Sequence, residues 1–254
     1  MLNDDQLCEN NPKRHPDFVD IIKTIIVTTM CFLVIGGNIL CLIVLSSRRT
    51  RGFILDTTRI LMTSLACTDC GMGLLVLPLC VYPALFHCWP FGDPICRMQA
   101  LFISSLFHES TLSLVLIAVD RYISIFHPLR YPVIVTRNNV IITVVLTWFI
   151  CFIVYGTVVL GFGQYYYDDV GINCEPYYQN TTVTATVMCL FYFPSAIIIV
   201  VCYLQIFRVA IEQRARISSE SGFQVIRLSD LQPLGRQYTK HIVMSNSTNP
   251  KYVL

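Results

Sequence analysis

The sequence predicts an all-α membrane protein, a helical bundle whose helices cross a lipid bilayer. Of its 254 residues, 54% are hydrophobic and only 13% are charged, whereas a soluble domain has about 25% charged residues. The mean hydropathy is +0.60. So few charges cannot cover a globular surface in water, and we therefore expect much of the chain to face lipid.

Five apolar runs are long enough to span a membrane, because a transmembrane helix needs about 20 such residues. They cover residues 21–45 and, roughly, 58–83, 94–125, 140–161 and 182–209. The third run has five polar residues in its interior, Ser104, Ser105, His108, Glu109 and Ser110. We therefore expect it to be a central helix that faces other helices.

The runs divide the chain into three parts. Residues 1–20 form a polar amino-terminal segment, residues 21–209 a five-helix bundle, and residues 210–254 a tail without a recognised domain. Arginines gather in the first and third connections and after the fifth run, while the fourth connection has no Lys or Arg. Since positively charged loops stay in the cytoplasm, we expect an extracellular amino terminus and a cytoplasmic tail.

Four of the twelve cysteines map to the predicted outer side: Cys8, Cys88, Cys96 and Cys174. Disulfides persist in that environment. The triplet Asn180-Thr181-Thr182, an acceptor for N-glycosylation, lies on the same side. These residues support the predicted orientation and make Asn180 the candidate glycosylation site.

Several classes of function are excluded or disfavoured. A formal charge of +2 is too small to indicate a nucleic-acid partner, and the chain has no recognisable catalytic motif, so we do not expect an enzyme. His108 and Glu109 are neighbours that point in different directions on a helix, so we expect no metal site there. Hydrogen bonds between helices are the favoured role of this pair, with proton sensing by His108 as the alternative.

A set of motifs resembles the rhodopsin-like (class A) G-protein-coupled receptors, in the order in which that family carries them. They are Gly37-Asn38, Leu65-Ala66-x-x-Asp69, Trp89-x-Phe91-Gly92, Cys96, Asp120-Arg121-Tyr122, Pro128-Leu129-x-Tyr131, Trp148, Cys174 and Phe191-x-x-Pro194. Details around Tyr203 and residues 214–219 are similar to an orphan subgroup related to the amine receptors. The resemblance covers about residues 21–220 and implies five of the seven transmembrane helices of a class A receptor, which suggests a truncated form.

The resemblance implies roles for the outer cysteines and for a carboxylate inside the membrane. Cys96 and Cys174 should form a disulfide that holds the fourth connection as a lid, while Cys8 and Cys88 either form a second bridge or remain free thiols. Asp69, with Ser110 nearby and Asn38 as a further hydrogen-bond donor, corresponds to the family's sodium site. The alternative is a protonated, structural Asp69, and no other cofactor is expected.

The inner end should couple to a heterotrimeric G protein. The residues implied are Asp120, Arg121, Tyr122, Pro128, Leu129 and Tyr131. Leu129 would pack into the G protein, and Tyr131 would hydrogen-bond to Asp120. The alternative is a cluster that only anchors the helix in the membrane.

The ligand crevice departs from the amine receptors. Those receptors carry an aspartate seven residues after the cysteine of the third helix, and the residue here is Ile103. By position, five residues would line the crevice: Ile103, Ser104, Phe107, Thr186 and Leu190. An apolar crevice suits an unknown small-molecule or lipid-like ligand, the tyrosine-rich lid at 165–167, or no ligand.

Two functions remain open. The first is a plasma-membrane receptor that transduces an extracellular signal to a G protein. The second is a non-signalling fragment that pairs with full-length receptors and retains them in the endoplasmic reticulum. Since the resemblance stops before a sixth helix, we expect weak coupling, poor folding, and poorly satisfied Asp69 and Glu109 side chains.

Overall fold

The computed structural model describes Cys8 and residues 15–47, 54–162, 165–168, 170–177 and 188–215. Within these residues, five helices are long and apolar enough to cross a membrane, which confirms the predicted bundle: Phe18–Ser46, Asp56–Phe86, Gly92–Phe126, Arg137–Gly161 and Phe193–Ala215. The first four agree with the predicted runs within a few residues. The fifth continues past residue 209, the predicted end, to Ala215.

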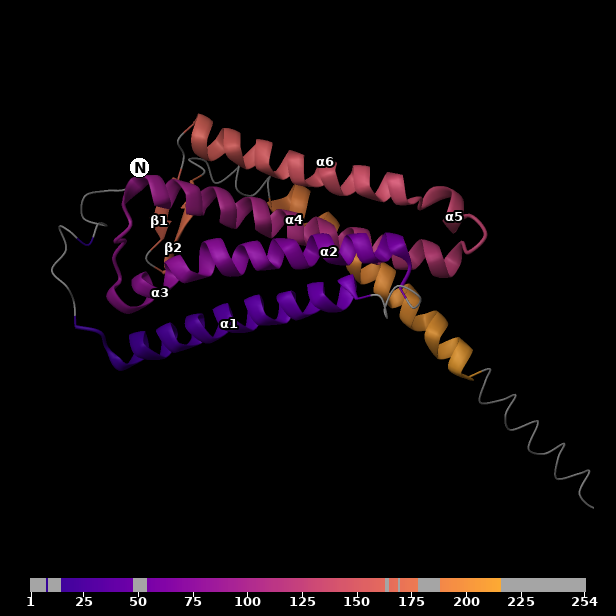
Figure 1. Ribbon diagram of the computed structural model, residues 1–254, viewed down its shortest axis with the longest axis horizontal. Coiled ribbons are helices and arrows are strands. Elements are labelled where there is room, and N and C mark those ends of the chain that lie inside the picture. Colours follow the sequence, from indigo (N-terminus) through magenta and orange to yellow (C-terminus); the bar gives the residue numbers. More distant parts are fainter. Residues whose placement is uncertain are drawn as a thin grey trace, which may run out of the picture. The chain divides into compact units, whose positions relative to one another are not determined.

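Two compact units make up the chain, residues 1–203 and 204–254. The described part of the second unit, residues 204–215, is helical. In the first unit, long helices lie side by side (Figure 1): α1 (Phe18–Ser46), α2 (Asp56–Gly71), α3 (Leu77–Phe86), α4 (Gly92–Phe126) and α6 (Arg137–Gly156). The helix α4 packs against α2, α6 and both strands of a small sheet. It is therefore the central helix that its polar residues predicted.

Short π-helical segments interrupt the long helices. They are η3 (Met72–Val76) between α2 and α3, η4 (Thr157–Gly161) after α6, and η5 (Met188–Tyr192) before the helix Phe193–Ala215. At Gly73 in η3, an added Cβ would lie 2.7 Å from Cγ1 of Ile35 on α1. Only glycine allows this approach, and the Sγ atom of Cys31 is 3.4 Å from the Gly73 carbonyl oxygen.

Helix ends follow local signals. Asp20 accepts a hydrogen bond from the backbone N–H of Asp17 (3.0 Å) at the start of α1, and Thr136 caps α6 by accepting one from Asn139 (3.3 Å). The helix α3 ends at His87, whose φ of 54° is left-handed. Cys88 follows this turn and is bonded to Cys8. The short helix α5 (Tyr131–Ile134) lies between α4 and α6 in the chain.

A two-stranded antiparallel hairpin departs from the all-α expectation. Strands β1 (Tyr165–Asp168) and β2 (Asn173–Pro176) pair so that Tyr167 lies opposite Cys174. The Asp168 carboxylate closes the turn by accepting the N–H groups of Val170 (3.1 Å) and Gly171 (3.0 Å). The hairpin is short and adds a cover to a structure that is otherwise a helical bundle.

The buried core is concentrated at the two ends of the bundle. At the end that carries Cys88 and Cys96, called the disulfide end below, the core contains Trp89, Cys96, Ala100, Leu101, Tyr155, Val159, Tyr165, Tyr167 and Cys174. At the opposite end, called the Asp120 end, Leu61, Ile117 and Val140 form a smaller cluster. The outward faces carry exposed apolar side chains such as Phe32 on α1 (73%), as expected for helices that contact lipid.

Candidate functional site

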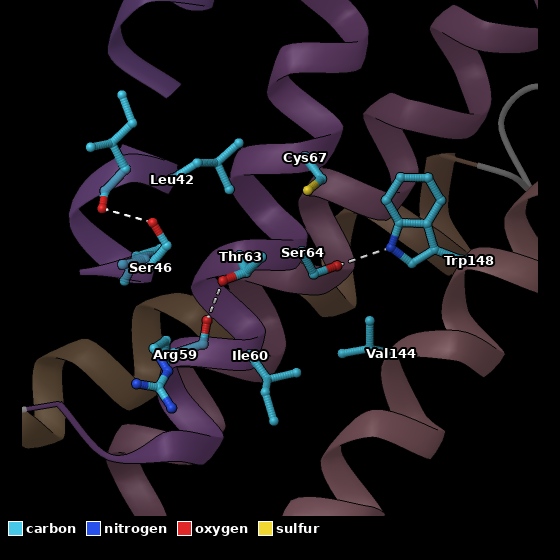
Figure 2. Close-up of a pocket in the computed structure, with 11 residues that line it drawn as sticks. Leu42, Ser46, Arg59, Ile60, Thr63, Ser64, Cys67, Val144 and Trp148 are labelled. Carbon is cyan, nitrogen blue, oxygen red and sulfur yellow. Dashed lines mark hydrogen bonds between the residues drawn. The ribbon is translucent and has the colours of Figure 1, made fainter. Parts of the chain in front are cut away.

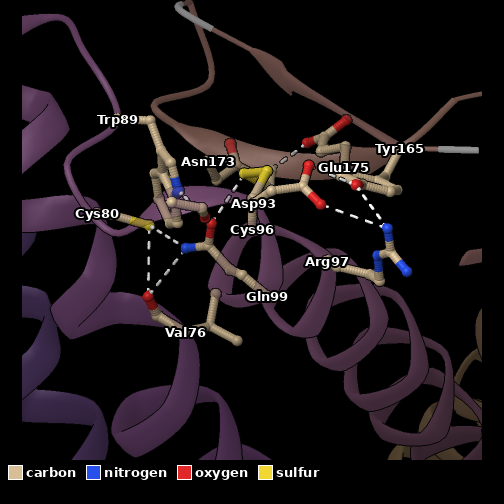
Figure 3. The surroundings of a disulfide bond; sticks show 12 residues. Val76, Cys80, Trp89, Asp93, Cys96, Arg97, Gln99, Tyr165, Asn173 and Glu175 are labelled. Carbon is tan, nitrogen blue, oxygen red and sulfur yellow. Dashed lines mark hydrogen bonds and ion pairs between the residues drawn. A yellow bond between two sulfur atoms is a disulfide. The ribbon is translucent and has the colours of Figure 1, made fainter. Parts of the chain in front are cut away.

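Both cysteine pairs suggested by the sequence are joined at the disulfide end (Figure 3). Cys96 on α4 is bonded to Cys174 on β2, with their Cα atoms 5.3 Å apart. Cys8 is bonded to Cys88 just after α3, with their Cα atoms 5.0 Å apart. The first bridge fixes the hairpin over the end of α4, and the second fixes the amino-terminal segment to the end of α3.

Gln99 is a buried residue that the sequence reasoning missed. Its Oε1 accepts the backbone N–H of Cys174 (2.8 Å), and its Nε2 donates to the carbonyl of Val76 (3.4 Å). Figure 3 shows this side chain between α3 and the hairpin. The one available signal was its position a helical turn after Cys96, on the same face of α4.

A cluster of charged and phenolic groups also attaches the hairpin to α4. The Tyr165 hydroxyl donates to Asp93 (2.5 Å) and accepts from Arg97 (3.1 Å), whose guanidinium also lies over the Tyr165 ring. Burial, with the neighbouring Asp93 carboxylate, raises the pKa of Tyr165. Tyr165 and Tyr167 are almost fully buried beside Trp89, so both tyrosines anchor the lid in the core of the disulfide end.

Three of the five predicted crevice residues lie on α4. Ile103 and Ser104 are half-buried, and Phe107 is 47% exposed with its ring 5.8 Å from that of Tyr192. Thr186 and the side chain of Leu190 lie outside the described residues, as does the glycosylation candidate Asn180.

His108, next to Phe107 on α4, is surrounded by three aromatic side chains. Its ring contacts the rings of Tyr155, Phe191 and Tyr192 at 4.8, 5.8 and 5.2 Å, and the Tyr155 hydroxyl is 2.9 Å from the imidazole. A ring nitrogen also lies 2.9 Å from the carbonyl oxygen of Ser104. The side chain thus has hydrogen-bond partners on α4 and α6, the role that the sequence favoured.

The candidate sodium site is partly assembled. The Ser110 hydroxyl donates to Asp69 (3.2 Å). Asn38, which we expected to donate to Asp69, instead donates to the carbonyl of Val34 one turn earlier in α1 (2.9 Å). The structure therefore shows Asn38 hydrogen-bonded within its own helix and not to Asp69.

Glu109 is fully buried but well supplied with donors, so the expectation that it would be poorly satisfied was also wrong. It accepts hydrogen bonds from Thr147 (3.0 Å) and Ser113 (3.5 Å), and the Cys151 thiol lies 3.8 Å away. Thr147 and Cys151 belong to α6, so Glu109 links the central helix to its neighbour. Within the described residues, no three His, Cys, Asp or Glu side chains form a group that could hold a metal ion.

At the Asp120 end, hydroxyl groups hold the carboxylate of the Asp-Arg-Tyr motif. Thr58 donates to one oxygen of Asp120 (2.8 Å) and Tyr131 to the other (2.7 Å). Thr57 lies 3.0 Å from the Tyr131 hydroxyl. The nearest approach of Arg121 is longer, with its Nε 4.0 Å from Asp120. The sequence pointed to Tyr131 but missed both threonines.

The rest of the predicted coupling set surrounds this cluster. The ring of Tyr122 stacks on Phe126 at 4.7 Å. Pro128 is exposed, and Leu129 is 93% exposed. Val133 (77%) and Ile134 (51%) in α5 are exposed as well, and a group of exposed apolar side chains is a candidate contact for a partner protein.

Comparison with known proteins places these features in a family. Residues 37–245 match the model of the seven-transmembrane receptors of the rhodopsin family, a range that extends beyond residue 220, where the motif comparison ended. The rat histamine H2 receptor is 32% identical over 212 residues, and the human one 31% identical over 216. The human trace amine-associated receptor 9 is 31% identical over 179 residues.

The aligned segments cover most of this chain but only part of each relative. They cover 82% and 83% of this chain for the rat and human histamine H2 receptors, and 65% for the trace amine-associated receptor. They cover only 58%, 59% and 49% of those relatives, so the chain spans somewhat more than half the length of the histamine receptors. With five potential membrane-spanning helices and a match over most of its residues, the chain belongs to the rhodopsin family of seven-transmembrane receptors.

Proposed function

We propose that this chain supplies the lid, the ligand crevice and part of the G-protein-facing end of a receptor that transduces an extracellular signal. One observation carries this proposal. At the Asp120 end, a buried carboxylate is held by Thr58 and Tyr131, next to the fully exposed Leu129. A receptor that couples to a partner protein needs a region where a charged group fixed by hydrogen bonds lies next to an exposed binding surface.

The geometry supports a two-state role for Arg121. Both oxygens of Asp120 accept hydroxyl hydrogen bonds, and the guanidinium lies at the limit of an ion pair, 4.0 Å away. At that distance its donors can be redirected to a partner without leaving Asp120 unpaired. A ligand that shifts α4 would change how readily Arg121 turns outward, which is the coupling between two sites that defines allostery.

The coupling proposal can be tested by resonance energy transfer between this chain and G-protein α subunits in cell membranes. We expect Leu129→Asp to abolish the proximity signal and Arg121→Ala to reduce it, because one removes the apolar contact and the other the guanidinium. Val170→Asp is the matched control, since Val170 is also 93% exposed but lies in the hairpin turn. A signal that Leu129→Asp leaves intact would contradict the proposal.

The ligand is proposed to be a small molecule that is not recognised as a protonated amine through the position of Ile103. The relatives are named for histamine and trace amines, yet Ile103 offers no carboxylate to an ammonium group. Its neighbours Phe107 and His108 offer an aromatic surface instead. Radiolabelled histamine should show no saturable binding to this chain. Micromolar binding would mean that another group replaces the missing carboxylate.

Further features complete the proposed receptor. Asp69 and Ser110 would hold a sodium ion as two of its oxygen ligands, since their oxygens already lie 3.2 Å apart and a hard cation prefers carboxylate and hydroxyl oxygen. We place the receptor in the plasma membrane with its amino terminus outside. Asn180 is then the proposed glycosylation site of the outer face.

A further inference from the structure

A cavity lies between three helices (Figure 2). Its volume is about 800 Å³. Side chains from α1, α2 and α6 line it: Leu42, Ile43, Leu45, Ser46, Arg59, Ile60, Thr63, Ser64, Cys67, Val144 and Trp148. The lining is mainly apolar, with a guanidinium and a few hydroxyl groups among it.

The cavity belongs to the membrane-facing part of the protein. All three helices that form it are long and apolar enough to cross a bilayer, and the lining residue Ile43 is 60% exposed. Its α1 wall therefore reaches the outer surface of the bundle, where lipid surrounds the helices. Whatever enters this cavity must have an apolar body.

Arg59 gives the cavity a charge preference. Its Nη2 forms an ion pair with Asp56 at the start of α2. Its Nη1 is buried and has no hydrogen-bond partner within the described part of the chain. A buried donor left unpaired carries a free-energy penalty, which is larger when the group is charged. An oxygen acceptor at this position would remove that penalty.

The sequence around Arg59 strengthens the preference. Arg48, Arg49 and Arg51 lie in the connection that joins the two helices forming the α1 and α2 walls. Asp56 is the one acidic residue from position 48 to position 59. Positive charge at the ends of membrane-spanning helices attracts anionic lipid.

We propose that this cavity binds an anionic phospholipid. The phosphate would accept hydrogen bonds from the guanidinium group of Arg59, which lines the cavity, and an acyl chain would lie along the apolar walls against Ile60, Val144 and Trp148. This goes beyond the proposed receptor function and does not depend on coupling to a G protein. A neutral lipid would fill the same walls but leave the guanidinium charge uncompensated.

Trp148 allows a direct test in the full-length chain. The chain has two tryptophans, and Trp89 is completely buried at the disulfide end, so contact quenching by lipid reports mainly on Trp148. The chain is placed in phosphatidylcholine nanodiscs that contain a fixed fraction of dibrominated phosphatidylserine or of dibrominated phosphatidylcholine. We expect the brominated serine lipid to quench more strongly, with a preference of roughly fivefold in relative association constant.

Three variants separate specific binding from general attraction. Arg59→Gln should reduce the preference to about one. Asp56→Asn should increase it, because the carboxylate no longer competes for the guanidinium. Arg130→Gln, which removes an exposed arginine near the Asp120 end that does not line the cavity, should leave it unchanged.

Several outcomes would overturn the proposal. An equal preference in the parent chain and in Arg59→Gln would mean that the cavity does not recognise charge. If Arg59→Gln and Arg130→Gln reduce the preference for phosphatidylserine equally, anionic lipid is attracted by the positive charge of the protein surface in general and not by the cavity. Displacement of the brominated lipid by cholesterol to the same extent with and without Arg59 would mean recognition of shape alone. Should Arg59→Gln fail to fold, an unchanged preference in Asp56→Asn would count against the proposal by itself.

Discussion

Glu109 shows how a buried acid is accommodated in the middle of a membrane-spanning helix. Its carboxylate takes hydrogen bonds from Thr147 on α6 and Ser113 on α4, while Cys151 lies close by. Its three neighbours are polar but uncharged, so the acid meets hydrogen-bond donors rather than an opposite charge. The main consequence of these hydrogen bonds is structural, because they fasten α4 to α6.

We predict that Glu109→Ala lowers the stability of the bundle by about 1–3 kcal/mol, because Thr147 and Ser113 lose a buried acceptor. Glu109→Gln should cost less than half as much, since its carbonyl oxygen still accepts from Thr147. The thermal unfolding temperature of the detergent-solubilised chain measures both effects. Equal losses in the two variants would show that packing around the side chain, and not its acceptor oxygen, is what matters.

Tyr131 connects the short helix α5 to Asp120, and its phenol is sensitive to high pH. Burial of the ring, with the nearby Asp120 carboxylate, raises the pKa of Tyr131 above its usual value. The folded protein therefore holds the phenolic proton more tightly than the unfolded chain. The resulting stabilisation is complete below about pH 10 and is lost as the pH rises through the higher folded pKa.

We therefore predict that Tyr131→Phe loses less stability than the parent chain when the pH is raised above about 10. The fall should not vanish, because burial also raises the pKa of Tyr165 and Tyr166. At neutral pH the variant should be less stable by about 1.5–3 kcal/mol, the range for a hydrogen bond to a charged group. Chemical unfolding at pH 7 and at pH 10.5–11.5 measures both. If Tyr131→Phe loses stability with rising pH as steeply as the parent chain, Tyr131 does not contribute to that pH dependence.

The hydrogen-bond partners of the functional side chains were harder to predict than the functional side chains themselves. The resemblance to the receptor family implied the contact between Tyr131 and Asp120, whereas no motif in the sequence pointed to Thr58 or Gln99. Whether these two side chains meet Asp120 or Cys174 depends on the rotation of each helix about its axis. The apolar run that identifies a membrane-spanning helix does not determine that rotation.

At the scale of elements, the two disulfides allow a controlled comparison. Their partners are separated by 80 and 78 residues, so the loop-entropy model gives each bridge nearly the same effect on the unfolded chain, about 4.5 kcal/mol. Any difference between removing one and removing the other must therefore arise in the folded state. Cys174 has the stronger folded-state support, because its N–H also donates to Gln99.

We predict that Cys96→Ser with Cys174→Ser releases the hairpin, while Cys8→Ser with Cys88→Ser leaves it in place. Hydrogen exchange of the amides in β1 and β2 measures this, since their antiparallel pairing protects them. Exchange should accelerate at least tenfold in the first double variant and less than twofold in the second. Similar protection in both variants would mean that Tyr165, Asp93 and Arg97 hold the hairpin without the bridge.

The elements themselves divide into predictable and unpredictable ones. The spans were predictable because a helix that crosses the hydrocarbon core of a bilayer needs a long run of apolar side chains. The hairpin was not predicted, although Tyr165–Tyr167 favour a strand and Asp168 and Gly171 are typical turn residues. The π-helical segment Met72–Val76 contains Gly73, which closely approaches Ile35, and hydropathy does not reveal such a contact between helices.

At the scale of the whole molecule, the distribution of arginines determines which way the bundle crosses the membrane. The first and third connections carry Arg48, Arg49, Arg51, Arg130 and Arg137, while the fourth connection has no Lys or Arg but contains Asp168 and Glu175. Positively charged loops are retained in the cytoplasm during insertion. The disulfide end should therefore lie outside the cell and the Asp120 end inside.

Glycosylation mapping tests this orientation directly, because acceptor triplets are modified only on the outer side. An acceptor tag placed before Met1 should be glycosylated, and the same tag inserted after Arg130 should not be. Treatment with an endoglycosidase shows whether a change in electrophoretic mobility comes from glycan. Replacing Arg130 and Arg137 with Asp should increase the fraction of molecules modified at the inner tag, since it removes the charge that retains this connection. Modification of the inner tag in the parent chain would reverse the orientation, and with it the assignment of the Asp120 end to the G protein.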